Sequence, residues 1–269
     1  MIVEKKYQNY SIFGQGSPLL FIHGTPGGPK KSYYLIKDYI QEGFELIIPK
    51  RWGYEKSEMK GKSFGEQSNE IYGIIQELKL SKVDILSISG GATIALNLLN
   101  DNPELFKSAV FISPILTKKL MIMLKIQSYL LNDKILSAFQ YLKNNHPSFY
   151  SKIALKILNI QYDSNLLTDN QLSYLDHVFD LIPTKERKAG IINDLNQFTK
   201  IENEVKTILT PTLLVYNTKD SYSNEYDRRI FEKVFKNHEM LEYYDSPHLP
   251  HISKNYKQIL SEIIQFYKN

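Results

Sequence analysis

The stretch "LSISGGATIAL", residues 86–96, joins an apolar strand-like run to an apolar helix-like run through two serines and two adjacent glycines. Residues 83–86 read as part of a short buried strand, and from Ala92 on the apolar residues recur at helical spacing. Ser89 therefore lies at a sharp strand-to-helix turn. A serine in such a turn presents its hydroxyl clear of the backbone, and the helix N-terminus behind it supplies unpaired N–H groups.

Two further polar residues follow predicted strands in the same manner. Asp220 comes just after the strand-like run 210–217, and His248 comes just after the run 239–244. In an open α/β sheet, ligands bind at the edge formed by the carboxyl ends of the strands. A serine hydroxyl needs a base, and a group that orients the base, to act as a nucleophile. The order Ser89, Asp220, His248 thus indicates nucleophilic catalysis, although each residue alone has an ordinary structural explanation.

Short apolar runs alternate with helical patterns along most of the chain. Strands are predicted at 17–24, 44–49, 83–88, 108–113, 210–217 and 239–244, and helices at 64–80, 90–100, 224–236 and 254–267. Ser63 and Glu66 form a plausible capping box. The alternation predicts an α/β fold with a mostly parallel sheet flanked by helices on both faces. Two strand-like runs joined by Gly14-Gln15-Gly16 predict an antiparallel hairpin at the edge of the sheet.

Strand signals vanish between Pro114 and about Val205. Helical segments are expected there near 115–143, 148–160, 168–182 and 184–198. We therefore expect residues 1–114 and 206–269 to form the core, and residues 115–205 to form a helical cap inserted between two strands.

Composition narrows the classes of protein. Hydrophobic residues make up 42% and charged residues 23% of the chain, the net charge is +4, and no basic block suggests a nucleic-acid partner. Cysteine is absent, which excludes disulfides, thiolate metal sites and a cysteine nucleophile. The N-terminus lacks the apolar core of a secretory signal, and no apolar run reaches the ~20 residues that span a bilayer. We expect a cytoplasmic protein without stable membrane insertion, and leave open whether the apolar stretch 115–131 touches lipid.

Four stretches together resemble one family. They are "FIHGTPGGP" (21–29), "IIPKRWGYEKSE" (47–58), "LSISGGATIAL" with the following "NPELFKSAVFISP" (102–114), and the loops of Asp220 and His248. In this order, over residues 17–252, they resemble the α/β-hydrolase fold family, and within it the capped group that has an HG-x-P-G loop. The resemblance is specific for the fold and the catalytic residues, and it leaves the substrate open.

The resemblance implies a Ser-His-Asp triad. Ser89 would be the nucleophile, His248 the general base and then the general acid, and Asp220 the group that orients the imidazole. The N–H of Gly90 would form one half of the oxyanion hole. The N–H of Thr25 would form the other half, with Gly24 as the less favoured alternative. The residues that would shape this loop are His23, Pro26, Gly27 and Gly28.

The chain departs from the family pattern at several positions. Ser87 stands where the family has a glycine, two residues before the nucleophile. Lys50 and Glu55 replace an aspartate and a glycine in the Asp-Arg-x-Gly-Tyr-Gly-x-Ser loop, and Pro247 replaces the glycine before the catalytic histidine. None of these replacements removes a group that takes part in the chemistry.

A serine hydrolase that cleaves a carboxylic ester or related acyl bond fits these residues best. "HGTPGG" also resembles the loop of proline iminopeptidases, but the tryptophan which that group has after the nucleophile is missing. Such a peptidase needs cap carboxylates for the substrate ammonium, and the candidates are Asp163, Asp169, Asp176, Asp180 and Glu186. Lactonases and carbon–carbon bond hydrolases share the triad, whereas dehalogenases and epoxide hydrolases have an aspartate in place of Ser89.

A non-catalytic ligand-binding protein on the same scaffold is the alternative from another class. The expected partner is a small ester, amide or short peptide, and the sequence leaves the oligomeric state open. No cofactor is expected, because Gly14-Gln15-Gly16 lacks the third glycine and the helix of a dinucleotide site. No metal is expected either, because no carboxylate–histidine cluster accompanies His251.

Overall fold

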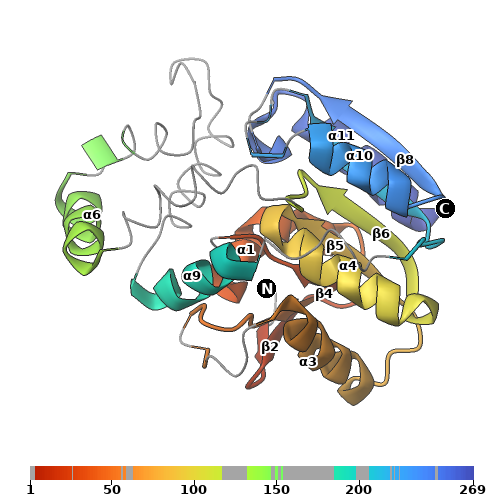
Figure 1. Ribbon diagram of the computed structural model, residues 1–269, viewed down its shortest axis with the longest axis horizontal. Coiled ribbons are helices and arrows are strands. Elements are labelled where there is room, and N and C mark those ends of the chain that lie inside the picture. The colour runs from red at the N-terminus through yellow and green to blue at the C-terminus, as the bar shows by residue number, and fades with distance from the viewer. Residues whose placement is uncertain are drawn as a thin grey trace.

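The structure is a computed structural model of the 269-residue chain (Figure 1). It describes residues 4–25, 27–55, 57–58, 63–116, 132–146, 149–150, 153, 185–197, 206–218, 220, 222–223, 225–245 and 248–269.

The described strands form an eight-stranded sheet in the order β1-β2-β4-β3-β5-β6-β7-β8. Their bounds are β1 (Glu4–Lys6), β2 (Tyr10–Phe13), β3 (Ser17–Ile22), β4 (Phe44–Pro49), β5 (Val83–Ile88), β6 (Phe106–Ile112), β7 (Thr212–Asn217) and β8 (His238–Tyr243). β1 and β2 run antiparallel to their neighbours, and every pairing from β4 to β8 is parallel. The mostly parallel α/β sheet predicted from the sequence is confirmed.

The predicted hairpin between the strands on either side of Gly14-Gln15-Gly16 is wrong. β2 pairs with β4 instead, with Phe13 opposite Leu46, and β3 pairs with the other side of β4. The glycine segment crosses the start of β4, where the N–H of Ser17 donates to the carbonyl of Gly43 at 3.0 Å. A Cβ on Gly16 would lie 2.0 Å from that same carbonyl oxygen, and Gly16 has a φ of +133°. The glycines thus allow a close crossing and not a hairpin turn.

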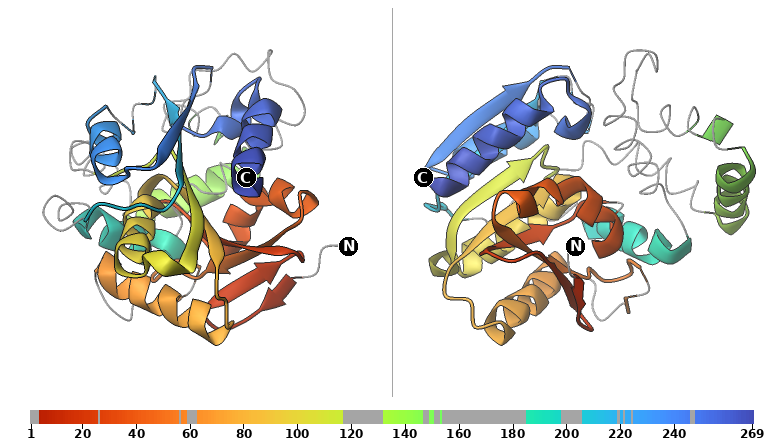
Figure 2. Two further views of the ribbon diagram at one scale, coloured as in Figure 1. Left: turned by 90° about the vertical axis from the view of Figure 1, so that its right-hand side faces the viewer. Right: turned by 180° about the vertical axis from the view of Figure 1, so that it is seen from behind.

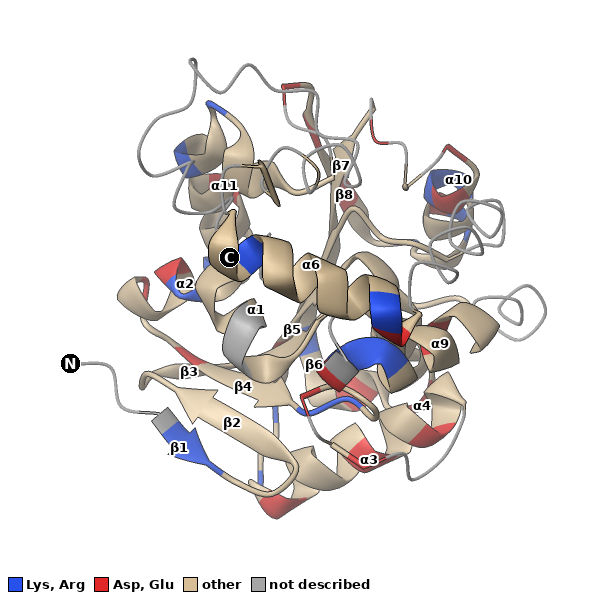
Figure 3. Cartoon of the chain, turned by 90° about the vertical axis from the view of Figure 1, so that its left-hand side faces the viewer, with Lys and Arg blue, Asp and Glu red and all other residues tan. Residues whose placement is uncertain are grey.

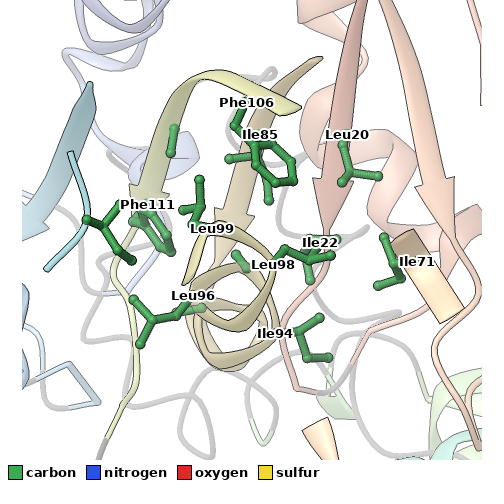
Figure 4. Close-up of a cluster of buried hydrophobic side chains, with 14 of the residues drawn as sticks. Leu20, Ile22, Ile71, Ile85, Ile94, Leu96, Leu98, Leu99, Phe106 and Phe111 are labelled. Carbon is green, nitrogen blue, oxygen red and sulfur yellow. The ribbon is translucent and has the colours of Figure 1, made fainter. Parts of the chain in front are cut away.

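Helices cover both faces of the sheet (Figure 2). One face packs against α3 (Phe64–Glu77), α4 (Ala92–Asp101) and α10 (Glu225–Val234), and the other packs against α1 (Pro29–Ile36), α2 (Asp38–Gln41) and α11 (Tyr256–Lys268). Strand residues alternate between the two cores: Leu20 and Ile22 pack with α4, whereas Leu19 and Phe21 pack on the opposite side. Figure 4 shows the first core, in which Leu96, Leu98 and Leu99 of α4 lie beside side chains of the strands, such as Ile22 and Phe111.

The helices of the core mostly lie where the hydrophobic spacing predicts them. The capping box of α3 is present, because Ser63 Oγ accepts from the N–H of Glu66 at 3.1 Å and Glu66 Oε2 accepts from the N–H of Ser63 at 2.9 Å. α4 begins two residues later than predicted, because residues 89–91 form a 3₁₀ turn. The hydrophobic spacing does not predict α1 and α2.

Between β6 and β7 the described helical elements are α6 (Asp133–Asn145), a 3₁₀ turn (Lys185–Arg187) and α9 (Lys188–Gln197). The helix expected over 115–143 is interrupted: residues 115, 116 and 132 are not helical, and the Asn132 side chain caps α6 by accepting from the N–H of Lys134. The segment 168–182 and most of 148–160 lie outside the described residues, so the 115–205 cap remains a prediction.

Charged side chains of both signs are interspersed on the elements of Figure 3. Over the part of the chain that the structure describes, no helix is long and apolar enough to span a bilayer.

Candidate active site

The strand order reverses between β3 and β5, which are neighbours in the sheet. From β3 the chain continues to β4 on one side, and from β5 it continues to β6 on the other side. The carboxyl ends of these two strands therefore flank the crevice where ligands of open α/β sheets bind. Gly24 follows β3 and Ser89 follows β5, so two of the predicted site residues lie at this point.

Ser89 occupies a strained backbone position directly after β5. Its φ is +53°, a left-handed conformation that non-glycine residues rarely adopt. The residue is 5% exposed and begins the 3₁₀ turn that leads into α4. Its carbonyl accepts a hydrogen bond from the N–H of Ile115 at 3.2 Å, which ties the turn to the chain after β6. We call this strained turn, Ile88 to Gly91, the elbow.

The loop after β3 lies in direct contact with this elbow. A Cβ placed on Gly24 would lie 2.9 Å from Ser89 Cβ and 3.5 Å from the backbone nitrogen of Gly90. On the elbow side, a Cβ on Gly91 would lie 2.5 Å from the carbonyl oxygen of Ile22. Contacts this close admit only glycine, so the backbones of the two loops approach each other directly beside Ser89.

Asp220 and His248 form a hydrogen-bonded pair beyond β7 and β8. His248 Nδ1 lies 2.7 Å from Asp220 Oδ2, and the Asp220 side chain is fully buried. The second carboxylate oxygen accepts from the N–H of Tyr222 at 2.8 Å. Tyr243 Oη donates to the carbonyl of His248 at 3.1 Å, which fixes the histidine loop. With Nδ1 directed at the carboxylate, Nε2 is the ring nitrogen available for proton transfer.

His23 is buried beneath the loop after β3. Its Nδ1 lies 2.9 Å from the carbonyl oxygen of Gly24, and a Cβ on Gly27 would lie 2.0 Å from Nδ1. Burial, with a smaller contribution from the positive charge of Arg51, holds the pKa of His23 well below its usual value. A neutral ring that donates from Nδ1 to this carbonyl fits the predicted role in shaping the loop. Pro26 lies outside the described residues.

Asp194, on α9, is a residue beside the site that the sequence pattern does not indicate. Its side chain is buried and forms an ion pair with Arg51, with 2.6 Å between Oδ1 and the guanidinium. Oδ2 accepts from the hydroxyl of Tyr54 at 2.6 Å and also from the hydroxyl of Thr25. Arg51 and Tyr54 lie in the stretch 47–58, which resembles the family. The sequence of α9, in contrast, contains no pattern that marks Asp194 as a site residue.

The structure describes three of the four departures from the family pattern. Lys50 Nζ donates to the carbonyls of Tyr7 and Gln8, at 2.7 and 3.1 Å, and so links the end of β4 to the segment before β2. The Ser87 hydroxyl is buried and has no hydrogen-bond partner among the described residues. Glu55 adopts a φ of +48°, a conformation that the family's glycine takes without strain. Pro247 lies outside the described residues.

His251 has a structural contact of its own. Its Nε2 lies 2.6 Å from the carbonyl oxygen of Leu35, and burial lowers its pKa to about 4. This histidine joins the loop after β8 to α1. That the chain needs no metal or cofactor stays a prediction.

Comparisons with known proteins agree with this fold. A sequence profile of the alpha/beta hydrolase fold matches residues 17–255. The chain is 26% identical over 96 residues to the "Uncharacterized hydrolase YcgS" of Bacillus subtilis, a match that covers 35% of this chain and only 34% of that protein. It is 25% identical over 259 residues to a "Probable alcohol acetyltransferase" of Cyberlindnera fabianii, covering 86% of this chain and 67% of that protein.

Among solved structures, an "Alpha/beta hydrolase fold protein" from Nakamurella multipartita superimposes with a TM-score of 0.75 at 19% identity, over 98% of both chains. The profile match covers residues 17–255, which is most of the chain. The chain therefore belongs to the α/β-hydrolase fold family.

Proposed function

We propose that the protein is a serine hydrolase that cleaves a carboxylic ester or a related acyl bond of a small molecule. Family membership supports a hydrolytic enzyme. The observation that carries the proposal is the Asp220–His248 pair, whose carboxylate is fully buried and which lies at the same sheet edge as the strained Ser89. A strained serine and an oriented imidazole are the two parts that nucleophilic acyl transfer requires.

In the proposed mechanism, Ser89 Oγ attacks the carbonyl carbon of the substrate and its proton moves to His248 Nε2. The tetrahedral intermediate collapses when His248 gives this proton to the leaving alcohol, and the acyl group stays on Ser89. Water, deprotonated by the same nitrogen, then attacks the acyl-enzyme. His248 returns the proton to Ser89 Oγ as the bond to the serine breaks, and the acid leaves. Asp220 holds the imidazole in the required tautomer and stabilises its charged form.

The N–H groups of Gly90 and Thr25 would stabilise the oxyanion. Each such donor is worth ~10²–10³-fold in rate in comparable sites. Support for Gly90 comes from the contact between the elbow and Gly24. The hydroxyl of Thr25 is engaged by Asp194, which leaves the backbone N–H as the donor that Thr25 can offer to a substrate.

The peptidase alternative has less support. Of the five carboxylates considered for the substrate ammonium, only Glu186 lies among the described residues, and its side chain is exposed to solvent. Asp194, a sixth carboxylate from the same segment, already accepts from three donors. Neither offers a buried carboxylate that is free to bind an amino group.

Acyl transfer to an alcohol is a second candidate, favoured by the 25% identity to the probable alcohol acetyltransferase over most of this chain. It shares the first half of the mechanism, because an alcohol can take the place of water in attacking the acyl-enzyme. The amounts of ethyl ester and free acid formed in the presence of ethanol distinguish the two. A mere ligand-binding protein would form neither.

The test is hydrolysis of p-nitrophenyl esters from acetate to octanoate, beside the p-nitroanilides of proline and alanine. Wild type is expected to cleave esters, and Ser89→Ala to lose this turnover. Ser108→Ala removes another buried serine hydroxyl, on β6, and is the matched control that should retain it. Turnover that survives in Ser89→Ala would contradict the proposal, and turnover of the proline anilide alone would favour the peptidase.

A further inference from the structure

We propose that Asp194 is a positioning residue for the oxyanion hole: its carboxylate holds Thr25 so that the backbone N–H faces the substrate oxygen. The inference rests on the proposed function and adds to it a residue outside the family motifs. The carboxylate of Asp194 is buried and contacts Thr25, in the loop beside Ser89.

Three donors from the core converge on Asp194. The Arg51 guanidinium binds Oδ1, and the hydroxyls of Tyr54 and Thr25 bind Oδ2. The two charged side chains are 0% and 1% exposed. Hydrogen bonds to an ionised acceptor away from water are strong and directional, so this carboxylate fixes the three groups in one arrangement.

The same ion pair holds the loop on both sides of Gly24. The second guanidinium nitrogen of Arg51 donates to the carbonyl of His23 at 3.0 Å, and Asp194 itself binds the hydroxyl of Thr25. Gly24, between these two residues, is the one that touches Ser89. A shift of Asp194 would therefore move the loop relative to the nucleophile.

The position of Asp194 is set by how α9 docks on the segment after β4. The N–H of Gly190 donates to the carbonyl of Gly53 at 3.1 Å. A Cβ on Gly190 would lie 2.4 Å from a ring carbon of Tyr54, so only glycine permits this approach. Ile191 and Leu195 pack with Tyr54 in a small hydrophobic cluster. The placement of α9 and that of the oxyanion loop are thereby coupled.

The inference predicts a specific kinetic signature. Loss of the Thr25–Asp194 contact displaces the backbone N–H of Thr25, which acts mainly in the transition state. The value of kcat should therefore fall while KM changes little. Asp194→Asn and Thr25→Val are each expected to lower kcat roughly 10- to 100-fold. Affinity for a trifluoromethyl ketone, which forms an oxyanion at the same place, should fall by a similar factor. Because the Thr25–Asp194 contact is the one that both variants disturb, the double variant should be about as slow as the slower single variant.

Ile75→Ala, on α3, is the control for a general loss of core packing, because it removes buried apolar contacts away from α9 and leaves the three donors in place. It should lower the thermal midpoint but not kcat at 25 °C. Thr25→Ser keeps a hydroxyl and should be markedly faster than Thr25→Val. If Asp194→Asn does not fold, as judged by circular dichroism, the comparison of Thr25→Val with Thr25→Ser carries the test.

Equal kcat in wild type, Asp194→Asn and Thr25→Val would overturn the role of Asp194 while leaving the serine mechanism intact. A loss of kcat in Ile75→Ala as large as in Asp194→Asn would also overturn it, because general packing would then explain both. Wild type without any turnover that depends on Ser89 would instead overturn the proposed function, and the role of Asp194 with it.

Discussion

Nδ1 of His248 lies 2.7 Å from Oδ2 of Asp220, on a carboxylate whose other oxygen is held by the N–H of Tyr222. The Asp220 carboxylate is therefore held by a second contact that does not involve the histidine. The imidazole of His248 takes its orientation from this buried carboxylate. An asparagine at 220 would keep the shape but would present either an amide N–H or a neutral oxygen to the ring.

Asp220→Asn is expected to lower kcat by ~10²–10⁴-fold, because the ring loses the tautomer that accepts the serine proton and the charge that stabilises the imidazolium. Steady-state kinetics on the best p-nitrophenyl ester measure the effect. Asp84→Asn is the matched control and should keep the wild-type kcat. Asp84 is also a buried carboxylate, but it lies at the amino end of β5, away from Ser89, and accepts from Ser108 Oγ. A wild-type rate in Asp220→Asn would contradict the assigned pair.

Gly24→Ala tests the contact between the two halves of the site. The added methyl group would meet Ser89 Cβ at 2.9 Å and the carbonyl oxygen of Ile88 at 2.8 Å, so the loop or the elbow must move. We expect kcat to fall at least ~10-fold. Gly73→Ala, on the exposed face of α3 with nothing within 4 Å, should keep full activity and gain about 0.5–1 kcal/mol of stability. If Gly24→Ala behaved like Gly73→Ala, the close approach would be wrong.

Ser87→Ala tests the departure from the family glycine. The hydroxyl is buried without a partner among the described residues, so its removal should raise the free energy of unfolding by about 1 kcal/mol. Urea titration measures this change. Ser108→Ala removes a buried hydroxyl that donates to Asp84 at 2.8 Å and should cost about 1 kcal/mol. Equal changes in the two variants would argue against an unpaired hydroxyl at Ser87.

Stability should fall as the solution is acidified from pH 7 toward 5. Burial lowers the pKa of His251 to about 4 and that of His23 well below its usual value, so both stay neutral in the folded protein. The unfolded chain binds these protons near pH 6.5, so the stabilisation is complete above that pH and is lost on the way down to the folded pKa. His251 alone contributes about 3 kcal/mol at most.

The measurement is the free energy of unfolding in urea at pH 7 and pH 5, for wild type and His251→Gln. The variant should show a smaller pH dependence, because glutamine does not titrate. His146→Gln, at an exposed position after α6, should keep the wild-type dependence. If the free energy of unfolding of His251→Gln differed between pH 7 and pH 5 by as much as that of wild type, His251 would not be held neutral in the folded protein.

The sequence was sufficient to predict the elements that have strong local patterns. β5 occupies the predicted residues 83–88, because a short apolar run between turn signals has few other structures open to it. Ser89, Asp220 and His248 could be found because each follows a strand and the family motifs mark them. The pairing of β2 with β4 could not be predicted, because apolar alternation indicates a strand but does not say which strand lies next to it.

Asp194 shows a second limit. Its contacts with Arg51 and Thr25 join residues 143 and 169 positions apart, and only the docking of α9 brings them together. An aspartate within a short helix ordinarily faces solvent. Similarly, the apolar spacing around Asn132 predicts a continuous helix, but the asparagine side chain instead caps α6.

Identification of the residue that becomes acylated tests the central claim most directly. Wild type, Ser89→Ala and His248→Ala would be treated with a fluorophosphonate, and the site of the adduct mapped by peptide mass spectrometry. The account predicts one adduct on Ser89, none in Ser89→Ala, and labelling slowed by roughly 100-fold or more in His248→Ala. An adduct on another residue, or none in a wild-type protein that hydrolyses esters, would contradict it.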